Sequence, residues 1–262
     1  MNFNLKNELG RLSEIVKGLD KKVIVIFLSV AIIQTISWYF TSRLFFEQNL
    51  FNYFSNDQNV DLFEFIYWFT GDFFSLFVLP VLVIIFVLKE NPKNYGLQLG
   101  DYRAGLKISF YFIMLMTIIV WFATSLPSFE KTYPLLRSTR ESWQIFFIFE
   151  TGLLLYLFAW EFIWRGFMLF GLEEKFGFYA VLIQMIPFVI LHNGKPVPET
   201  FGAILGGIAL GIIAFRTRSI LYCVIVHGSV MFTIDLISVL RYKAANYGVG
   251  ISSLINIIKE IF

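Results

Sequence analysis

The sequence predicts an all-α protein, a polytopic transmembrane bundle of about seven to eight helices. Of its 262 residues, 57% are hydrophobic and 15% are charged, whereas soluble domains carry about 25% charged residues. The apolar residues gather in blocks near the ~20 residues that a helix needs to cross a bilayer. Short polar stretches with turn residues separate these blocks. The composition therefore leaves no room for a soluble domain of any size.

The first segment, 1–22, is basic and precedes the first apolar block. Its apolar residues recur at helical spacing, which is typical of an amphipathic helix on a membrane surface. A solvated cytoplasmic tail fits the same residues equally well. The apolar positions are Leu5, Leu9, Leu12, Ile15, Val16 and Leu19.

The chain then divides into N-terminal transmembrane helices (23–142), core helices (143–240) and a C-terminal tail or short helix (241–262). Polar residues at 43–61 predict a loop, and Asp72 is expected as a solvated carboxylate near a helix end. Two glycine pairs at a spacing of four, Gly202/Gly206 and Gly207/Gly211, predict close helix packing. The expected spans are 23–39, 66–88, 106–126, 143–170, 178–191, 200–215 and 220–240.

Lys and Arg residues predict the orientation of these spans. More of them fall on one side when the N-terminus is placed in the cytoplasm, which is the side that positive charges favour. We therefore expect a multi-pass protein of the cell membrane with its N-terminus inside.

The stretch 156–171 contains the charged residues of the core that are candidates for a functional site. It is an apolar run with one carboxylate, Glu161, and one guanidinium, Arg165. Residues four apart on a helix share a face and can pair. A charge at that depth costs about 2.5–3.5 kcal/mol on insertion scales, so the pair is either structural or part of a functional site.

The only two histidines of the chain, His192 and His227, also lie in or at the end of apolar blocks. Intramembrane histidines face the bundle interior or a polar cavity. A carboxylate with one histidine can deprotonate water, and a second histidine can stabilise an oxyanion. Together these residues supply the groups needed to hydrolyse an amide.

Three motifs in this region resemble a known family. They read WEFIWRG at 160–166, FVILH at 188–192 and HGSVM at 227–231. In order and spacing they resemble the CAAX prenyl protease and bacteriocin-processing (CPBP or Abi) family of intramembrane peptidases. The resemblance covers about 143–240. It implies a bacterial endopeptidase of the cytoplasmic membrane that acts on a membrane-associated or lipidated peptide or protein substrate.

Two positions depart from the family pattern. Trp160 stands where the family has its water-activating glutamate, and Met231 stands where it has Asn or Asp. Two replacements are open: Glu161 itself serves as the base with His192, or Glu199 enters the site after the proline-rich turn. The resemblance gives His227 the oxyanion role and Arg165 the role of holding Glu161 ionised.

Other functions find less support in the sequence. Two histidines and a glutamate can form a zinc site, but the specific His-Glu-x-x-His spacing is missing, so no cofactor or metal is predicted. There is no basic patch for nucleic acid. A catalytically inactive relative that acts as a scaffold, chaperone or immunity protein is the alternative to a peptidase. A transporter is a weaker one, since no internal repeat is found.

Overall fold

The computed structural model describes residues 5–261, and within this range the chain is helical and contains no strand. The α-helices are α1 (Leu5–Lys17), α2 (Lys21–Ile36), α3 (Arg43–Asn49), α4 (Phe51–Phe54), α5 (Val60–Phe73), α6 (Leu79–Leu82), α7 (Tyr102–Ala123), α8 (Pro127–Thr132), α9 (Trp143–Glu161), α10 (Leu169–Phe176), α11 (Tyr179–Ile190), α12 (Val197–Thr217), α13 (Leu221–Ala244) and α14 (Ile251–Ile258).

Wider π-helical turns join several of these helices into longer rods. They cover Ser37–Thr41, Phe74–Val78, Val83–Leu88 and Phe162–Met168. Such turns are rare and often accompany functional sites. The last of them contains Arg165 and follows Glu161 directly, so the predicted charged pair lies at an irregularity of its helix.

Six continuous helices are long and apolar enough to cross a membrane, judged by length and composition over the described residues. A seventh apolar helix, α11, is shorter. This confirms an all-α polytopic bundle. The six helices run over Lys21–Asn49, Val60–Leu88, Tyr102–Ala123, Trp143–Phe176, Val197–Thr217 and Leu221–Ala244.

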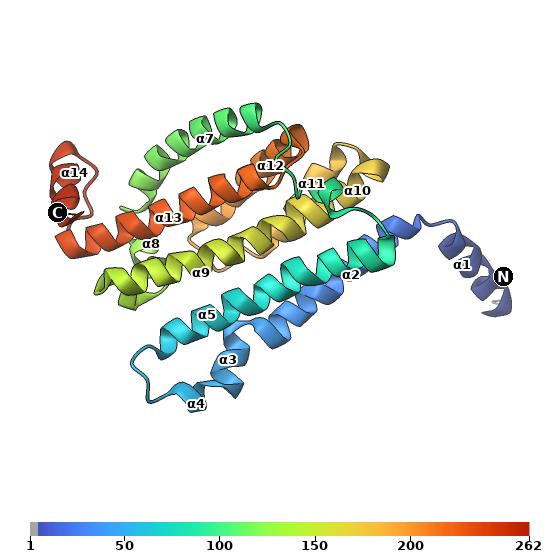
Figure 1. The fold of residues 1–262 in the computed structure, drawn as a ribbon, viewed down its shortest axis with the longest axis horizontal. Helices are drawn as coiled ribbons and strands as arrows, with labels where there is room; N and C mark the ends of the chain where they lie inside the picture. The colour runs from blue at the N-terminus through green and yellow to red at the C-terminus, as the bar shows by residue number, and fades with distance from the viewer. Residues whose placement is uncertain (1–4, 262) are drawn as a thin grey trace.

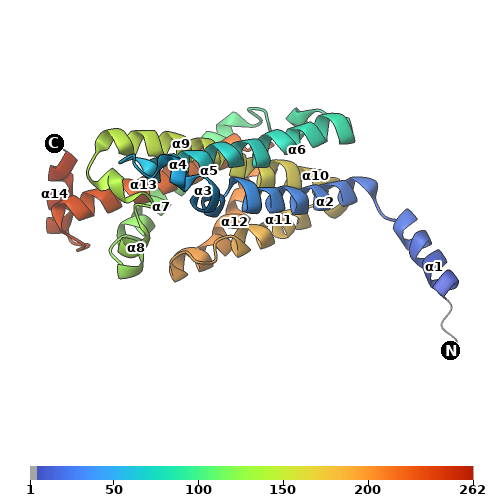
Figure 2. The same ribbon diagram turned by 90° about the horizontal axis from the view of Figure 1, so that it is seen from below.

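Four helices, α5, α9, α13 and α7, lie side by side in that order, and α2 lies next to the rod that contains α5 (Figure 1). Helices α11 and α12 pack on one face of this row (Figure 2). One group of buried apolar side chains includes Trp164 and Phe167, where α9 passes into its π-helical turn. A second apolar group joins α5, α9 and α13 to the segment around α8.

Local signals fix the start of the central helix. The Ser142 side chain accepts a hydrogen bond from the backbone N–H of Ile145 and so caps α9. From this cap, the long apolar helix α9 runs through the middle of the bundle, where it contacts both α5 and α13.

Three local expectations were wrong. The stretch 43–61 is not a plain loop, because α3 and α4 fold within it. Asp72 is not solvated: it is 2% exposed and accepts hydrogen bonds from neighbouring hydroxyl and indole groups. Of the glycines, Gly207 and Gly211 pack against α11, but a side chain at Gly202 or Gly206 would meet open space.

The two ends of the described chain differ from the bundle. Helix α1 buries none of its residues and extends away from the bundle (Figure 2). Its apolar side chains Leu5, Leu9 and Leu12 are exposed. At the other end, the tail contains the short helix α14, which packs on α13.

Candidate active site

Glu161 and Arg165 form a buried ion pair at the end of α9. The Arg165 guanidinium Nη1 lies 3.2 Å from Glu161 Oε1, and both side chains are 0% exposed. The pairing that the i, i+4 spacing predicts is therefore present. An isolated charge at this depth would be costly, and the partner offsets that cost.

His227 brings α13 to the same carboxylate. Its Nδ1 lies 2.6 Å from Glu161 Oε1, across the contact between α9 and α13. An ionised carboxylate can only accept, so the Nδ1 of His227 carries the proton in this bond. The Nε2 of the neutral ring is then left as an acceptor. The His227 side chain remains partly exposed.

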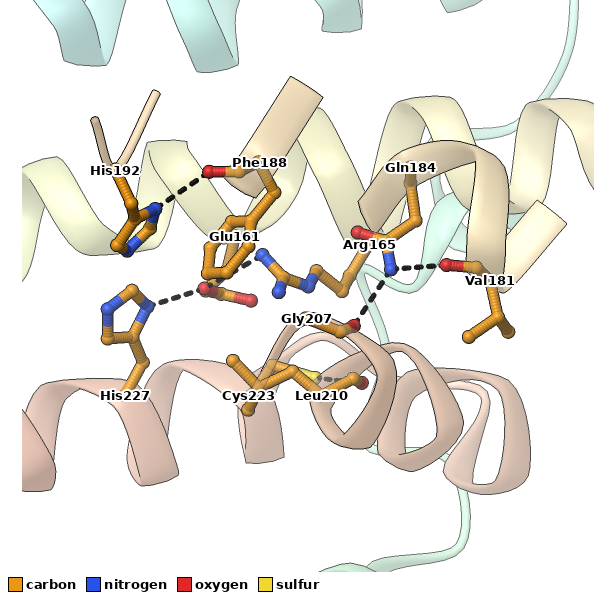
Figure 3. A network of polar contacts seen from close by, with 10 residues as sticks. All are labelled: Glu161, Arg165, Val181, Gln184, Phe188, His192, Gly207, Leu210, Cys223 and His227. Carbon is orange, nitrogen blue, oxygen red and sulfur yellow. Dashed lines mark hydrogen bonds and ion pairs between the residues drawn. The ribbon is translucent and has the colours of Figure 1, made fainter. Parts of the chain in front are cut away.

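His192 follows α11 and approaches from the opposite helix layer. Its Nδ1 lies 2.7 Å from the backbone carbonyl oxygen of Phe188. A carbonyl cannot donate, so this contact also fixes the proton on Nδ1 and leaves Nε2 as an acceptor. In Figure 3 the imidazole rings of His192 and His227 lie one above the other beside Glu161.

Phe188 contacts both Arg165 and His192. The Arg165 guanidinium carbon stands 4.0 Å from the centre of its ring, a cation–π contact. The centre of the His192 ring is 4.4 Å from the same ring. One side chain therefore contacts both groups, and its own backbone carbonyl orients the histidine.

Gln184 links α11 to α12 beside this site. Its amide nitrogen donates to the carbonyl oxygens of Val181 on its own helix and Gly207 on α12. Figure 3 shows these two bonds at the end of the network away from the histidines. Gly207 and Gly211 allow the close approach, since a Cβ at Gly211 would meet the Gln184 amide.

Glu199 lies in a different polar group. Both of its carboxylate oxygens accept from the Tyr133 hydroxyl, at 2.6 and 2.8 Å. The Lys195 ammonium lies 3.3 Å from the same hydroxyl. Burial, opposed by the charge of Glu199, lowers the pKa of Lys195, and burial raises the pKa of Tyr133. Within 5–261, no hydrogen bond or ion pair joins Glu199 to His192 or His227.

The two departures from the family pattern fill apolar space. Trp160 packs beside the site, with its ring centre 6.3 Å from that of His192 and 5.6 Å from that of Trp164. Met231 is buried in the apolar group between α5, α9 and α13. Neither supplies a carboxylate or an amide. Glu161 remains the acidic group that the structure brings to the histidines.

Several polar atoms at the centre have no hydrogen-bond partner among the described residues. They are Glu161 Oε2, Arg165 Nε and Arg165 Nη2. Buried polar atoms in native proteins are normally paired, and exceptions gather at functional sites. These unpaired atoms are consistent with the ion pair forming part of the candidate site.

Sequence reasoning missed several polar partners. Tyr133, which holds Glu199, gave no signal because it lies 66 residues away in the sequence. The carboxyl groups of Glu150 on α9 and Asp235 on α13 interact with each other. Glu150 is 9% exposed, and Asp235 is fully buried.

No group of three or more His, Cys, Asp or Glu side chains within the described part of the chain is arranged to hold a metal ion. Cys223 is buried, and its thiol contacts the carbonyl oxygen of Leu210 (Figure 3). The polar groups that converge are thus one carboxylate, one guanidinium and two imidazoles. This set can move protons and stabilise charge without a redox step.

A comparison with known protein families matches the region that contains this site. Residues 141–233 match a family model described as type II CAAX prenyl endopeptidase Rce1-like. The match contains Glu161, Arg165, His192 and His227, and it confirms the predicted family resemblance of the core helices. No curated protein and no solved structure matches the chain.

Proposed function

Since residues 141–233 carry a domain like that of the type II CAAX prenyl endopeptidases, we propose that this multi-pass membrane protein is an intramembrane endopeptidase. It would hydrolyse a peptide bond of a membrane-associated or lipidated substrate. The observation that carries the proposal is the hydrogen bond between Glu161 and His227, which joins a buried carboxylate to a partly exposed imidazole.

The base in this proposal is His227. Glu161 accepts a hydrogen bond from the Nδ1–H group of His227. It thereby orients the ring and stabilises the imidazolium that forms when Nε2 takes a proton. When the His227 ring is neutral with its proton on Nδ1, its Nε2 can accept a proton from water.

His192 would hold the attacking water from the second side. Its Nε2 is an acceptor because Nδ1 donates to the Phe188 carbonyl. Arg165 keeps Glu161 ionised. This division of roles differs from the sequence-based one, in which Glu161 acted with His192, because the hydrogen bonds of Glu161 are to His227 and Arg165.

The proposed reaction balances without a cofactor. The water oxygen forms a bond to the substrate carbonyl carbon while His227 Nε2 takes one water proton. The imidazolium N–H then faces the developing oxyanion, which matches the oxyanion role expected for this histidine. Collapse of the tetrahedral intermediate breaks the C–N bond, and the proton on His227 Nε2 passes to the leaving amine.

Substitution of the three polar groups tests this function. Glu161→Gln, His227→Ala and His192→Ala should each lower the rate of cleavage by about 10²–10⁴-fold, the usual contribution of a positioned acid or base. The measurement is cleavage of a natural substrate, identified from membrane-protein termini that depend on the wild-type chain. Leu205→Ala, on the exposed surface of α12, is the matched control and should retain full activity.

A second function is favoured by one observation. Trp160, at the family's glutamate position, packs against His192 and fills the adjacent space with an indole ring. This arrangement suits a catalytically inactive scaffold, chaperone or immunity protein. If both histidine variants keep the biological activity of the wild type while Arg165 variants lose abundance, the scaffold replaces the peptidase.

A further inference from the structure

The turn between α11 and α12 carries His192 and is largely exposed. It covers 191–196, and Leu191, Asn193 and Gly194 are exposed within it. Exposed segments with few buried contacts open at a low cost in free energy. A histidine that holds water for a reaction must instead keep one orientation. The contacts that hold this turn therefore bear directly on where the His192 ring lies.

The first turn of α12 is bonded to the backbone of His192. The Thr200 hydroxyl donates to the His192 carbonyl oxygen at 2.9 Å. The backbone N–H of Lys195 donates to the same oxygen at 3.1 Å. His192 is thus tied to α12 as well as to α11, and its position depends on how the first turn of α12 is held.

Tyr133 holds a residue at each end of the proline-rich stretch. Its hydroxyl lies 2.6 and 2.8 Å from the two carboxylate oxygens of Glu199, in the first turn of α12, and donates to that carboxylate. The same hydroxyl accepts from the Lys195 ammonium at 3.3 Å. The ammonium also lies 5.0 Å from the centre of the Tyr133 ring, a cation–π contact. One side chain therefore joins the turn to the helix that follows it.

Tyr133 is itself firmly held. It is 0% exposed, and its ring stacks on that of Phe129 in α8, with 5.7 Å between the ring centres. Its carbonyl oxygen accepts from the guanidinium groups of Arg137 and Arg140, at 3.2 and 3.1 Å. The Arg140 guanidinium carbon also lies 4.4 Å from the centre of the Tyr242 ring on α13. The hydroxyl thus belongs to a segment that is attached to the bundle by several contacts.

We propose that Tyr133 is a positioning residue for His192. It acts through Glu199 and Lys195, which fix the turn between α11 and α12. The inference rests on the proposed function, in which His192 holds the attacking water. Within the described residues the Tyr133 hydroxyl bonds to Glu199 and Lys195 and not to a reacting group. Tyr133 precedes 141–233, so the site depends on a segment outside the region that matches the family model.

The chain has only two histidines, which allows a test that needs no turnover. In full-length protein with isotope-labelled histidine in nanodiscs, nuclear magnetic resonance gives separate ring-nitrogen signals for each imidazole. Tyr133→Phe removes the hydroxyl and keeps the ring. The His192 signals should broaden or split, because the turn is released and the ring takes more than one orientation. The His227 signals should stay unchanged, since Glu161 still accepts from that ring.

Cleavage of the substrate identified from membrane-protein termini supplies a second readout. Tyr133→Phe should lower kcat by about 10–100-fold with little change in KM, because a displaced group slows the reaction more than it weakens substrate binding. Tyr95→Phe is the matched control. Tyr95 is 1% exposed, and its hydroxyl donates to the Glu90 carboxylate at 2.7 Å. The control removes the same kind of bond before α7 and should change neither the histidine signals nor kcat.

A double-mutant cycle isolates the bond between Tyr133 and Glu199. Glu199→Ala should change the His192 signals in the same way as Tyr133→Phe. The double variant should have no larger effect than either single variant, because both substitutions break the same hydrogen bond. Fully additive effects would contradict the proposal, since the two residues would then act on His192 independently.

Two further results would overturn the proposal. Unchanged His192 signals in Tyr133→Phe would mean that the hydroxyl does not hold the turn. Equal changes at His192 and His227 would mean that Tyr133 supports the bundle as a whole. The signals do not depend on cleavage. If the wild-type chain cleaves no membrane protein but the His192 signals respond as expected, the peptidase function fails while the role of Tyr133 in holding the ring stands.

Discussion

Arg165 combines contacts that stabilise the buried core with a place in the proposed active site. It pairs with Glu161, stacks on Phe188 and is fully buried. Its neighbour Phe188 positions His192 through a backbone carbonyl. A substitution at Arg165 would therefore remove the charge that pairs with Glu161, and it would alter the packing of Phe188, which positions His192.

We expect Arg165→Met to destabilise the protein by about 3–5 kcal/mol, the usual cost of removing one partner from a buried ion pair. The reason is that Glu161 would remain buried with His227 as its only partner. Thermal unfolding in detergent measures the effect.

The double variant Glu161→Gln/Arg165→Met separates the two roles. Because it removes both charges, it should recover much of the lost stability, while cleavage stays abolished. Recovery of activity in the double variant would contradict a role for Glu161 in the reaction.

At the scale of the element, Asp72 joins α2 and α5. Its carboxylate accepts from Ser37 and Thr41 of the π-helical turn after α2 at 2.8 and 2.5 Å. Within its own helix it accepts from the Trp68 indole at 2.8 Å. This one side chain therefore adds hydrogen bonds to the apolar contacts between the first two spans.

Asp72→Ala should lower the midpoint of thermal unfolding, because four donors lose this acceptor and an unpaired buried group costs about 1–3 kcal/mol. Asp72→Asn should cost less, because the amide oxygen can still accept. Asp61→Ala, at the exposed start of α5, is the control. An equal effect of the Ala substitutions at both positions would mean that the hydrogen bonds of Asp72 do not stabilise the contact between the two spans.

The sequence predicts the elements better than their contacts. Apolar blocks fix the spans, and the spacing of Glu161 and Arg165 predicts their pair because both lie on one helix. The partners of Asp72, Glu150 and Glu199 could not be predicted, since each depends on how separate helices rotate against one another. Histidines were easier to assign because the chain has only two.

At the scale of the whole molecule, the helices cross the membrane in alternating directions, and the positive charges favour a cytoplasmic N-terminus. The turn between α4 and α5 would then lie outside, and the segment before α7 would lie inside. Helix α1 would rest its exposed apolar face on the inner leaflet, with Lys6 and Arg11 near lipid head groups.

Cysteine labelling in intact cells tests this orientation. In a Cys223→Ser background, Asn56→Cys should react with an impermeant maleimide from outside, and Lys93→Cys should react only after permeabilisation. The positions lie on opposite ends of the helix rod Val60–Leu88, so the pair serves as its own control. The reverse pattern would invert the orientation.

The separation of Glu161 and His227 by 66 residues bears on how the protein is made. Chains emerge from the N-terminus first, so α9 enters the membrane before α13 exists. Glu161 and Arg165 lie four residues apart on that one helix, and they can neutralise each other during insertion. The imidazole arrives only with a later helix. On the proposed mechanism, the newly made chain would therefore be inactive until α13 is in place, and its own unfinished helices would not meet an assembled site.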